Sequence, residues 1–143
     1  MASERETRVR AFFRAVERND FEALAGLVGD GYVWIDHTTD TVASTPEELQ
    51  AAVEEDAAWS DRMFVIDRAM ETSDGAVVVQ MTNTQTLTGE WRSIRGQGQR
   101  VRREICEIFR FDEDDRIVVE EMYEDALTLM RQLGAITAGG MQR

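Results

Sequence analysis

Two glutamates stand inside a stretch that alternates like a β-strand, "VRREICEIFRF" at residues 101–111. Successive side chains of a strand point to opposite faces, so Glu107 shares a face with Ile105 and Phe109, while Glu104 lies on the other. The face with Glu107 is the more apolar of the two. Burial there would raise the pKa of the Glu107 carboxyl and favour its neutral form. The sequence therefore predicts a candidate acid, Glu107, in this strand.

Two interpretations of Glu107 are open from the residues alone. In one, the side chain is an acid that projects into an apolar pocket. In the other, it is a structural carboxylate neutralised by a nearby arginine, such as Arg103 or Arg92. The two interpretations predict different neighbours for the same carboxyl group.

A second group of carboxylates lies in the last predicted strand. Alternation places Glu120, Met122 and Glu124 on one face. A one-residue bulge would exchange the faces and bring Glu121 and Tyr123 inward instead. The acidic row is either a set of acids for a pocket or a strand end that is solvated or paired with arginine.

Asp36 ends "YVWID", residues 32–36, a short run of β-branched and aromatic residues that predicts a strand. It is either a functional carboxylate or an Asx-turn residue that caps the polar loop after it. The next residue, His37, is the only histidine, so we expect either a solvated side chain or a proton relay beside Asp36. With one histidine and with Cys106 as the only cysteine, we expect no metal site.

Three helices are expected in the first part of the chain. Ser3 caps an amphipathic pattern, and Asp20 caps a second helix that ends near the turn at residues 29–31. Thr45 begins a third helix, which should run to about Trp59.

From residue 62 onward the pattern changes to that of strands. Hairpin signals and alternation predict an antiparallel meander of four strands. They cover residues 62–70, 76–88, 101–111 and 117–123. A short helix should follow at residues 127–133, and residues 135–143 read as a frayed tail. This order favours the α+β class, with a curved antiparallel sheet wrapped around the N-terminal helices to form a conical pocket.

The composition fits one folded unit. The chain has 143 residues, 43% of them hydrophobic, so we expect a single domain over residues 1–143. A formal net charge of −12 argues against nucleic acid as a partner, because that affinity comes from cations that neutralise phosphates. No stretch approaches the roughly 18 apolar residues of a membrane span, and no signal-peptide pattern is present. We therefore expect a cytoplasmic protein that binds no membrane.

Four strings of the sequence follow a recognisable order: "FFRAVERNDFEALAGLV", "TLTGEW", "GQRVRREICEIFRF" and "RIVVEEMYEDALTLMRQLGAI". With the order of elements, they resemble the nuclear transport factor 2-like superfamily and, within it, the SnoaL-like polyketide cyclase branch with its ketosteroid isomerase-like cone fold. The resemblance covers nearly the whole chain, but it specifies the fold better than the reaction, since the superfamily includes isomerases, cyclases, epoxide hydrolases and members without catalysis. It implies a homodimer packed through the sheet, one apolar pocket per subunit, and acid chemistry with no metal or cofactor.

The resemblance also implies roles for two candidates. Glu107 matches the acidic position that isomerase-like members use to donate a hydrogen bond to a substrate oxygen. Asp36 falls, within about one residue, on their general-base position. It would move a proton next to a carbonyl while Glu107 stabilises the oxyanion.

The sequence departs from the family at two places. SnoaL-type cyclases place a catalytic Asp on the last strand, where the best register puts Met122, so Glu120 or Glu124 would have to replace it. Epoxide hydrolases of the superfamily need an Arg-x-Asp pair on an earlier strand, where this chain has "MTNT" at residues 81–84. We therefore exclude epoxide hydrolysis by that set of residues.

These observations predict a cofactor-independent acid–base enzyme that cyclises or isomerises a small, hydrophobic, polyketide-like carbonyl compound through an enolate. Its catalytic candidates are Asp36, Glu107, Glu120 and Glu124. Its expected pocket wall, made of residue types that also fill ordinary cores, is Tyr32, Trp34, Trp59, Phe64, Met81, Phe109 and Met122. Two alternatives stay open. One is a non-catalytic binding or dimerisation module of the same fold. The other is a cyclase that opens an epoxide with Asp36 as base and Glu107 or Glu104 as acid.

Overall fold

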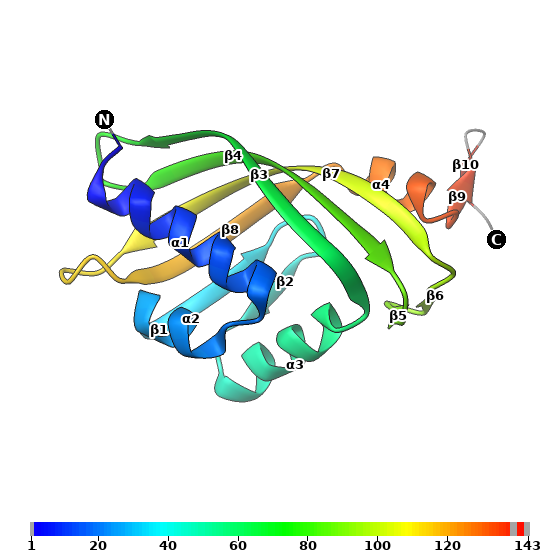
Figure 1. Ribbon diagram of the computed structural model, residues 1–143, viewed down its shortest axis with the longest axis horizontal. Helices are drawn as coiled ribbons and strands as arrows, with labels where there is room; N and C mark the ends of the chain where they lie inside the picture. Colours follow the sequence, from blue (N-terminus) through cyan, green and yellow to red (C-terminus); the bar gives the residue numbers. More distant parts are fainter. Residues whose placement is uncertain (1, 138–139, 142–143) are drawn as a thin grey trace.

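The computed structural model describes residues 2–137 and 140–141 (Figure 1). The helices are α1 (Glu4–Arg18), α2 (Phe21–Leu27), α3 (Pro46–Asp56) and α4 (Ala126–Gln132). The strands are β1 (Val28–Asp36), β2 (Thr41–Ala43), β3 (Trp59–Glu71), β4 (Val77–Leu87), β5 (Glu90–Trp91), β6 (Ile94–Arg95), β7 (Gln99–Phe111), β8 (Ile117–Glu124), β9 (Ile136–Thr137) and β10 (Gly140–Met141). Among the described residues, no helix is both long enough and apolar enough to cross a membrane.

Six strands form one sheet in the order β2-β1-β8-β7-β4-β3. The long strands β3, β4, β7 and β8 pair antiparallel in that succession, which confirms the predicted meander. β1 joins the sheet parallel to β8, and β2 pairs with β1 at the edge. The sheet curves around α1, α2 and α3, which lie on the same side of it (Figure 1). The expected α+β class is therefore confirmed.

The predicted caps set where the helices begin. Ser3 and Asp20 accept hydrogen bonds from backbone N–H groups in the first turns of α1 and α2. Thr45 and Glu48 form a reciprocal capping box at the start of α3. These side chains satisfy donors that a helix cannot pair internally, so each helix starts at a defined place against the sheet.

The end of α3 differs from the sequence-based expectation. The helix stops at Asp56, and the carbonyl of Ala58 accepts hydrogen bonds from the backbone N–H groups of Thr88 and Gly89, in the loop between β4 and β5. Trp59 then begins β3, where it pairs with Leu87, and its ring packs edge-on against Trp91 with centroids 5.4 Å apart. The placement of Trp59 on a helix was wrong because strand pairing starts at that residue.

β1 is longer than the predicted strand at residues 32–36, since it starts at Val28. The turn expected at residues 29–31 is an irregularity inside this strand, because the pairing of β1 with β8 shifts between Val28 and Val33. Gly31 lies at this shift with a φ of 76°, a conformation that side chains with a Cβ rarely adopt. The irregularity sits just ahead of the residues that reach the candidate site.

The C-terminal region is described only in part. Helix α4 confirms the predicted terminal helix. Within the expected tail, β9 and β10 pair as a short antiparallel hairpin. Residues 138–139 and 142–143 lie outside the described residues.

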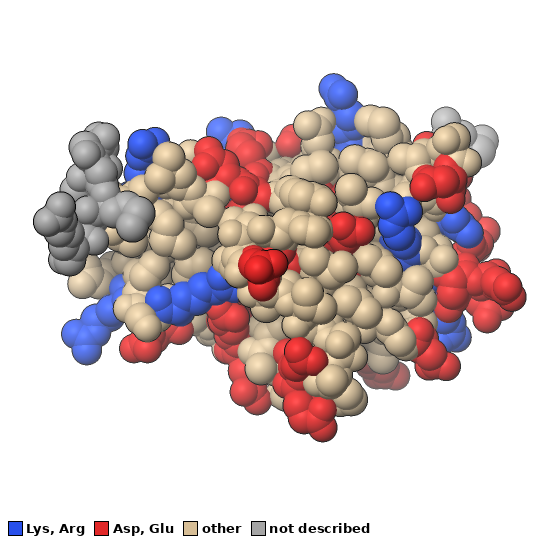
Figure 2. Space-filling model, turned by 180° about the vertical axis from the view of Figure 1, so that it is seen from behind, with Lys and Arg blue, Asp and Glu red and all other residues tan. Residues whose placement is uncertain are grey.

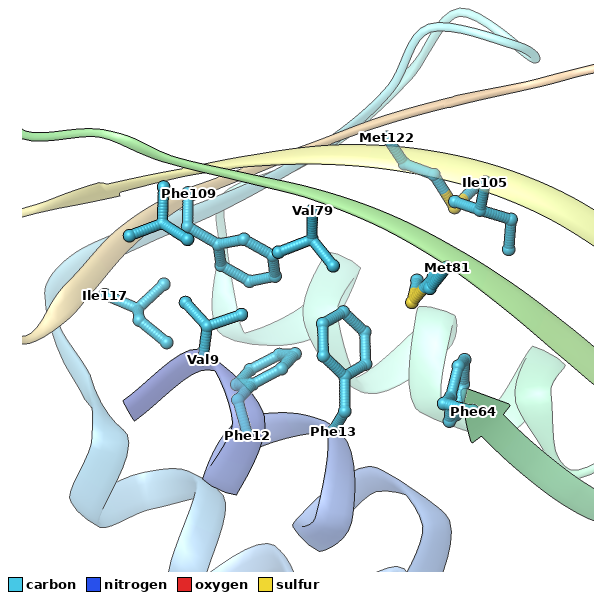
Figure 3. Close-up of a cluster of buried hydrophobic side chains, with 11 residues drawn as sticks. Val9, Phe12, Phe13, Phe64, Val79, Met81, Ile105, Phe109, Ile117 and Met122 are labelled. Atoms are coloured by element: carbon cyan, nitrogen blue, oxygen red, sulfur yellow. The ribbon is translucent and has the colours of Figure 1, made fainter. Parts of the chain in front are cut away.

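The main core lies between α1 and the concave face of the sheet (Figure 3). Phe12 and Phe13 of α1 meet Phe109 of β7 edge-on, with ring centroids 5.5 and 5.6 Å apart. Such aromatic pairs stabilise a core by about 1 kcal/mol beyond the area they bury. This packing holds α1 against the sheet and forms the floor beneath the candidate site.

Candidate functional site

A cavity of about 990 Å³ lies between the concave face of the sheet and the three N-terminal helices. That volume is at the upper end for a small-molecule site, so a polycyclic ligand would fit. The expected wall residues that line it are Tyr32, Trp34, Trp59, Phe64, Met81 and Met122. Three expected catalytic carboxylates, Asp36, Glu107 and Glu120, line it as well. The site is thus an apolar hollow with a few acidic groups in its wall.

Phe109 is the expected wall residue that the structure places elsewhere. Its ring is completely buried against α1, in the core beneath the cavity, and it is not part of the lining. Alternation gave it the correct face of β7. The face of a strand does not decide whether a helix covers it, and α1 covers Phe109.

Two of the carboxylates flank Met122 in one row across the sheet. Asp36 of β1 pairs with Met122 of β8, which in turn pairs with Glu107 of β7. Neighbouring strands are about 4.8 Å apart, so the backbones of Asp36 and Glu107 are separated by roughly 10 Å. A flat ligand lying over Met122 would have one carboxyl group on each side.

Glu107 is almost completely buried, with 2% of its surface exposed. Burial raises the pKa of its carboxyl well above the ordinary value of 4.5, and the neighbouring charge of Glu120 raises it further. Its Oε2 atom has no hydrogen-bond partner among the described residues. Of the two interpretations made from the sequence, the structure therefore favours a pocket acid, because a glutamate rather than an arginine is its immediate partner.

Glu120 is the hydrogen-bond acceptor at the centre of the cluster. The Tyr32 hydroxyl donates to Glu120 Oε1, and Glu107 is the second hydrogen-bond partner of the same carboxylate. Burial raises the pKa of Glu120, and these two hydrogen bonds oppose that rise. For Tyr32, burial and then the Glu120 charge raise the pKa of the phenol well above 10.0.

The proton of this cluster therefore resides on Glu107. Both carboxyl groups are buried, so both favour the neutral form, but only Glu120 receives two donated hydrogen bonds that stabilise its anion. When two buried carboxyl groups are in contact, the stable arrangement is one neutral group that donates a hydrogen bond to the other, which is the anion. We define Tyr32, Glu107 and Glu120 as the acid cluster.

Asp36 lies in a different environment on the same cavity wall. It is 3% exposed, and its two oxygens accept hydrogen bonds from the Thr38 backbone N–H at 2.9 Å and the Thr39 hydroxyl at 2.8 Å. Arg92 lies 3.8 Å from it. The Asx turn expected as one alternative is therefore present. A carboxylate has about four acceptor sites, so these contacts leave lone pairs that can still take a proton.

Glu124 is the catalytic candidate that does not reach the cavity. It forms a forked ion pair with Arg103, in which Nε lies 2.8 Å from the carboxylate. Its side chain is only 4% exposed, and it is not among the lining residues. This end of the acidic row is paired with arginine, which was the second interpretation offered for it from the sequence.

The outer face of the sheet holds the side chains that a bulge would have brought inward. The ring of His37 stacks on Tyr123 with centroids 4.3 Å apart, and its Nε2 lies 2.9 Å from Glu121. The role of His37 as a proton relay beside Asp36 is therefore contradicted. Glu104 also faces outward, where it is 63% exposed and pairs with Arg102, so it cannot serve as the acid of an epoxide-opening pair.

Sequence reasoning did not identify Arg62 and Asn83 as residues of the cavity wall, and it offered Arg92 and Arg103 only as partners of Glu107. Arg62, Arg92, Arg103 and Asn83 all line the cavity. The alternation that placed Glu107 inward also places Arg103 inward, so this signal was available. Arg92 reaches the cavity from the β5–β6 hairpin, and no periodicity predicts that. Among the described residues, no group of three or more His, Cys, Asp and Glu is placed to hold a metal ion.

Comparison with known proteins identifies the family. Residues 9–120 match the SnoaL-like domain. The chain belongs to the SnoaL-like domain family. The match spans α1 to the middle of β8, and so it includes all three members of the acid cluster. The resemblance seen in the sequence is therefore confirmed, while no curated protein matches significantly.

Solved structures confirm the cone fold of this SnoaL-like chain. A proposed SnoaL-like polyketide cyclase from Shewanella denitrificans OS-217 is similar with a TM-score of 0.82 and 18% identity, over 93% of this chain and 98% of that one. A hypothetical protein from Catenulispora acidiphila DSM 44928 with a ketosteroid isomerase-like fold, in complex with trimethylamine, has a TM-score of 0.71 and 16% identity, over 89% and 92%. An LEH-like epoxide hydrolase from M. tuberculosis has a TM-score of 0.70 and 20% identity, over 91% and 89%. At such identities the likeness shows the fold, and the reaction must be argued from the site.

Proposed function

We propose that this SnoaL-like protein is an acid–base enzyme that needs no cofactor and acts on a small, hydrophobic, polyketide-like carbonyl compound. The observation that supports this most is the buried Glu107 carboxyl in the wall of an apolar cavity, with one oxygen free of any partner among the described residues. Burial raises the pKa of this carboxyl and favours its neutral form. A carboxyl group kept neutral in this way can donate a hydrogen bond to a substrate oxygen. The products would be those of an aldol-type cyclisation or an isomerisation.

The proposed reaction begins with removal of a proton from the carbon next to the substrate carbonyl. Asp36 is the proposed base; the electron pair of the broken C–H bond forms the C=C bond, and the π electrons of the carbonyl move onto its oxygen to give an enolate. Glu107 donates a hydrogen bond to that oxygen, and low-polarity surroundings strengthen this interaction. The enolate carbon then attacks a second carbonyl to close a ring, and the alkoxide formed there takes the proton from Asp36. In an isomerisation, Asp36 instead returns the proton to another carbon of the enolate system.

Glu120 and Tyr32 have a supporting role in this proposal. Glu120 accepts hydrogen bonds from both of its partners, and it therefore orients Glu107 and keeps the proton on it. The reserve-acid role expected for Glu120 from the sequence is not part of this proposal, because Glu107 holds the shared proton. Glu124 is no longer proposed for this role, because its ion pair with Arg103 occupies it outside the cavity.

A second function is favoured by one specific observation. Asp36 already serves as an Asx-turn acceptor. The resemblance in the sequence also implies that Met122 takes the place of the acid of SnoaL-type cyclases. A non-catalytic module that binds a small hydrophobic molecule would need no base at either place. Both functions predict ligand binding, and only the first predicts proton transfer. The same two carboxyl groups, Asp36 as base and Glu107 as acid, also fit the epoxide-opening cyclase considered from the sequence, since both line the cavity.

The outer face of the sheet supports the proposed homodimer. Met63 and Val65 of β3 are 55% and 52% exposed, and Tyr123 of β8 is 43% exposed on the same side. From behind, the surface is largely uncharged, with separate acidic and basic side chains scattered across it (Figure 2). We expect light scattering to give the mass of a dimer, and Val65→Glu to shift it toward the monomer. A monomeric wild-type protein would contradict this proposal.

Proton exchange tests the catalytic proposal without knowledge of the natural substrate. Aromatic ketones such as 2-tetralone are first screened for quenching of tryptophan fluorescence, since Trp34, Trp59 and Trp91 line the cavity. Ketones that bind are then incubated in deuterated buffer, and NMR follows exchange of the protons next to the carbonyl. We expect the wild-type protein to accelerate exchange, and Glu107→Gln to lower the enzymatic rate by about 100-fold or more.

The matched control is Glu104→Gln, which makes the same change on the exposed face of the same strand. It should exchange ketones at the wild-type rate. If bound ketones show no accelerated exchange, the binding module is the better function. If Asp36→Asn and Glu107→Gln both exchange at the wild-type rate, the proposed mechanism is wrong.

A further inference from the structure

A second polar position lies in the cavity wall, away from the acid cluster. Asn83 is on β4 and is 1% exposed, and its Oδ1 atom has no hydrogen-bond partner among the described residues. More than nine in ten buried polar groups in proteins are satisfied, so an unpartnered amide oxygen in a ligand-sized cavity requires a reason.

The orientation of this amide follows from a bulge in the neighbouring strand. The pairing of β3 with β4 shifts between Ser60 and Met63, and Asp61 has a φ of 52° at this shift. The Asn83 Nδ2 group donates to the carbonyl of Met63 at 3.2 Å. Reversing the amide would bring two oxygens together, so the bulge fixes Oδ1 as the atom that remains free.

A donor group near Asn83 also lacks a partner. Arg62 lies within the same bulge and lines the cavity, and its Nε atom has no hydrogen-bond partner among the described residues. The rest of the Arg62 guanidinium contacts the Asp56 carboxylate, 3.4 Å from Nη2, and lies over the ring of Phe64. A hydroxyl group both donates and accepts hydrogen bonds, so it matches a free acceptor and a free donor on adjacent strands.

The register of the sheet gives the separation between this position and Glu107. Asn83 is four residues along β4 from Val79, which pairs with Glu107. At about 3.3 Å per residue, the two side chains are attached roughly 13 Å apart along the strands. Both face the cavity, so a ligand that contacts both must be elongated.

We propose that Asn83 Oδ1 forms a subsite that accepts a hydrogen bond from a hydroxyl group of the ligand. The ligand class is then an elongated, rigid, apolar molecule with a carbonyl at one end and a hydroxyl at the other. The Asn83 contact stands on its own, and only the placement of the carbonyl at Glu107 rests on the proposed function.

Paired probes can test the contact by binding alone. Estrone has a phenol and a ketone at opposite ends of a rigid ring system, and its 3-methyl ether keeps the shape and the ketone but lacks the phenolic donor. Titration of tryptophan fluorescence gives Kd for each probe. We expect the wild-type protein to bind estrone about tenfold more tightly than the ether, because the ether leaves Oδ1 unpaired.

The Asn83→Ala variant should bind both probes with nearly equal Kd. The ratio of the two Kd values is informative even if the variant is less stable, because a loss of folded protein weakens both probes alike. Glu107→Gln should keep the tenfold ratio, so a failure of the proposed function at Glu107 is seen separately. Thr84→Ala, at the next side chain on the opposite face, is the matched control and should keep the ratio too.

A crystal structure of the wild-type protein with estrone is the second measurement, and it does not depend on a variant that folds. The expected result places the phenol oxygen within hydrogen-bond distance of Asn83 Oδ1. The subsite is disproved if neither probe binds the wild-type protein, if the two bind equally, if Asn83→Ala keeps the preference, or if the phenol lies elsewhere.

Discussion

The buried carboxylates on the inner face of the sheet are of two kinds: one kind lies at or beside the cavity wall with an arginine, and the other lies within the acid cluster. Asp36 and Glu124 each have an arginine, at 3.8 Å for Arg92 and at 2.8 Å for Arg103. In the acid cluster, by contrast, Glu107 and Glu120 are hydrogen-bond partners of each other, and Tyr32 donates to Glu120.

The two kinds differ in what compensates the charge of the carboxylate: a nearby arginine in the first kind, and a shared proton in the second. A guanidinium is always charged and compensates the charge of a neighbouring carboxylate, whereas two buried carboxyl groups in contact do not both ionise easily. One small hollow can therefore offer a proton acceptor and a proton donor at the same pH. In the proposed mechanism, Asp36 beside Arg92 would accept the proton, and Glu107, which has a glutamate as its partner, would donate the hydrogen bond.

The largest expected effect comes from breaking an arginine pair. Arg103→Ala leaves the Glu124 side chain, which is 4% exposed, without its partner. Loss of one member of a buried ion pair costs about 3–5 kcal/mol of unfolding free energy. Urea denaturation measures this directly.

Arg102→Ala is the control for that experiment, because Arg102 is the neighbouring residue and its pair with Glu104 is exposed at 68% and 63%. Exposed pairs contribute about 0–1 kcal/mol. Equal losses in the two variants would show that the buried pair gives no special stability.

The next effect is a change in how stability depends on pH. Because burial raises the pKa of Glu107, the folded protein binds a proton that the unfolded chain releases above the ordinary value of 4.5. The stability from this proton is complete below 4.5 and is lost as the pH rises through the raised pKa, at up to about 1.4 kcal/mol per pH unit.

Glu107→Gln keeps the shape without the titration, so it should flatten this slope. Urea midpoints from about pH 5 to pH 8 test this. The expected outcome is a variant that gains stability relative to the wild-type protein as pH rises. A constant difference across this range would argue against a buried neutral acid.

A smaller effect is expected at the third member of the acid cluster. Tyr32→Phe removes the hydroxyl that donates to Glu120, and hydrogen bonds to buried charged groups contribute about 1.5–3 kcal/mol. The variant should unfold at lower urea. An unchanged midpoint would mean that this hydrogen bond does not stabilise the Glu120 anion.

The smallest effect is expected at the second arginine pair. Arg92 is 27% exposed, pairs with Glu55 at 2.6 Å and lies 3.8 Å from Asp36. Asp36 also has two hydrogen bonds of its own. Arg92→Gln should therefore cost about 1 kcal/mol or less. A loss as large as that of Arg103→Ala would show that the two arginine pairs are equivalent.

Much of this architecture could be predicted from local sequence patterns. Alternation placed Glu107, Glu120 and Met122 on the inner face, and cap residues such as Thr45 placed the helix starts, because both depend only on near neighbours in the chain. The exit of Trp59 into β3 depends on pairing with a strand nearly thirty residues later, so the helix pattern could not reveal it.

Which side chains pair with the site residues could not be predicted from the sequence. Glu107 had two possible arginines in the sequence, yet its partner is Glu120, which lies diagonally across from it on the neighbouring strand. Arg103 lies on the inner face as alternation requires, but it pairs with Glu124 instead. Periodicity gives the face of a strand, and register with the neighbouring strand decides the pair.

The protonation state of Glu107 in the folded protein tests the central claim most directly. Carbon-13 NMR of the glutamate side-chain carboxyls, with the Glu107→Gln spectrum to assign the signal, follows this group from about pH 4 to pH 9. We predict a titration midpoint well above 4.5, with the neutral form populated near neutral pH. A midpoint at or below 4.5 would contradict the account.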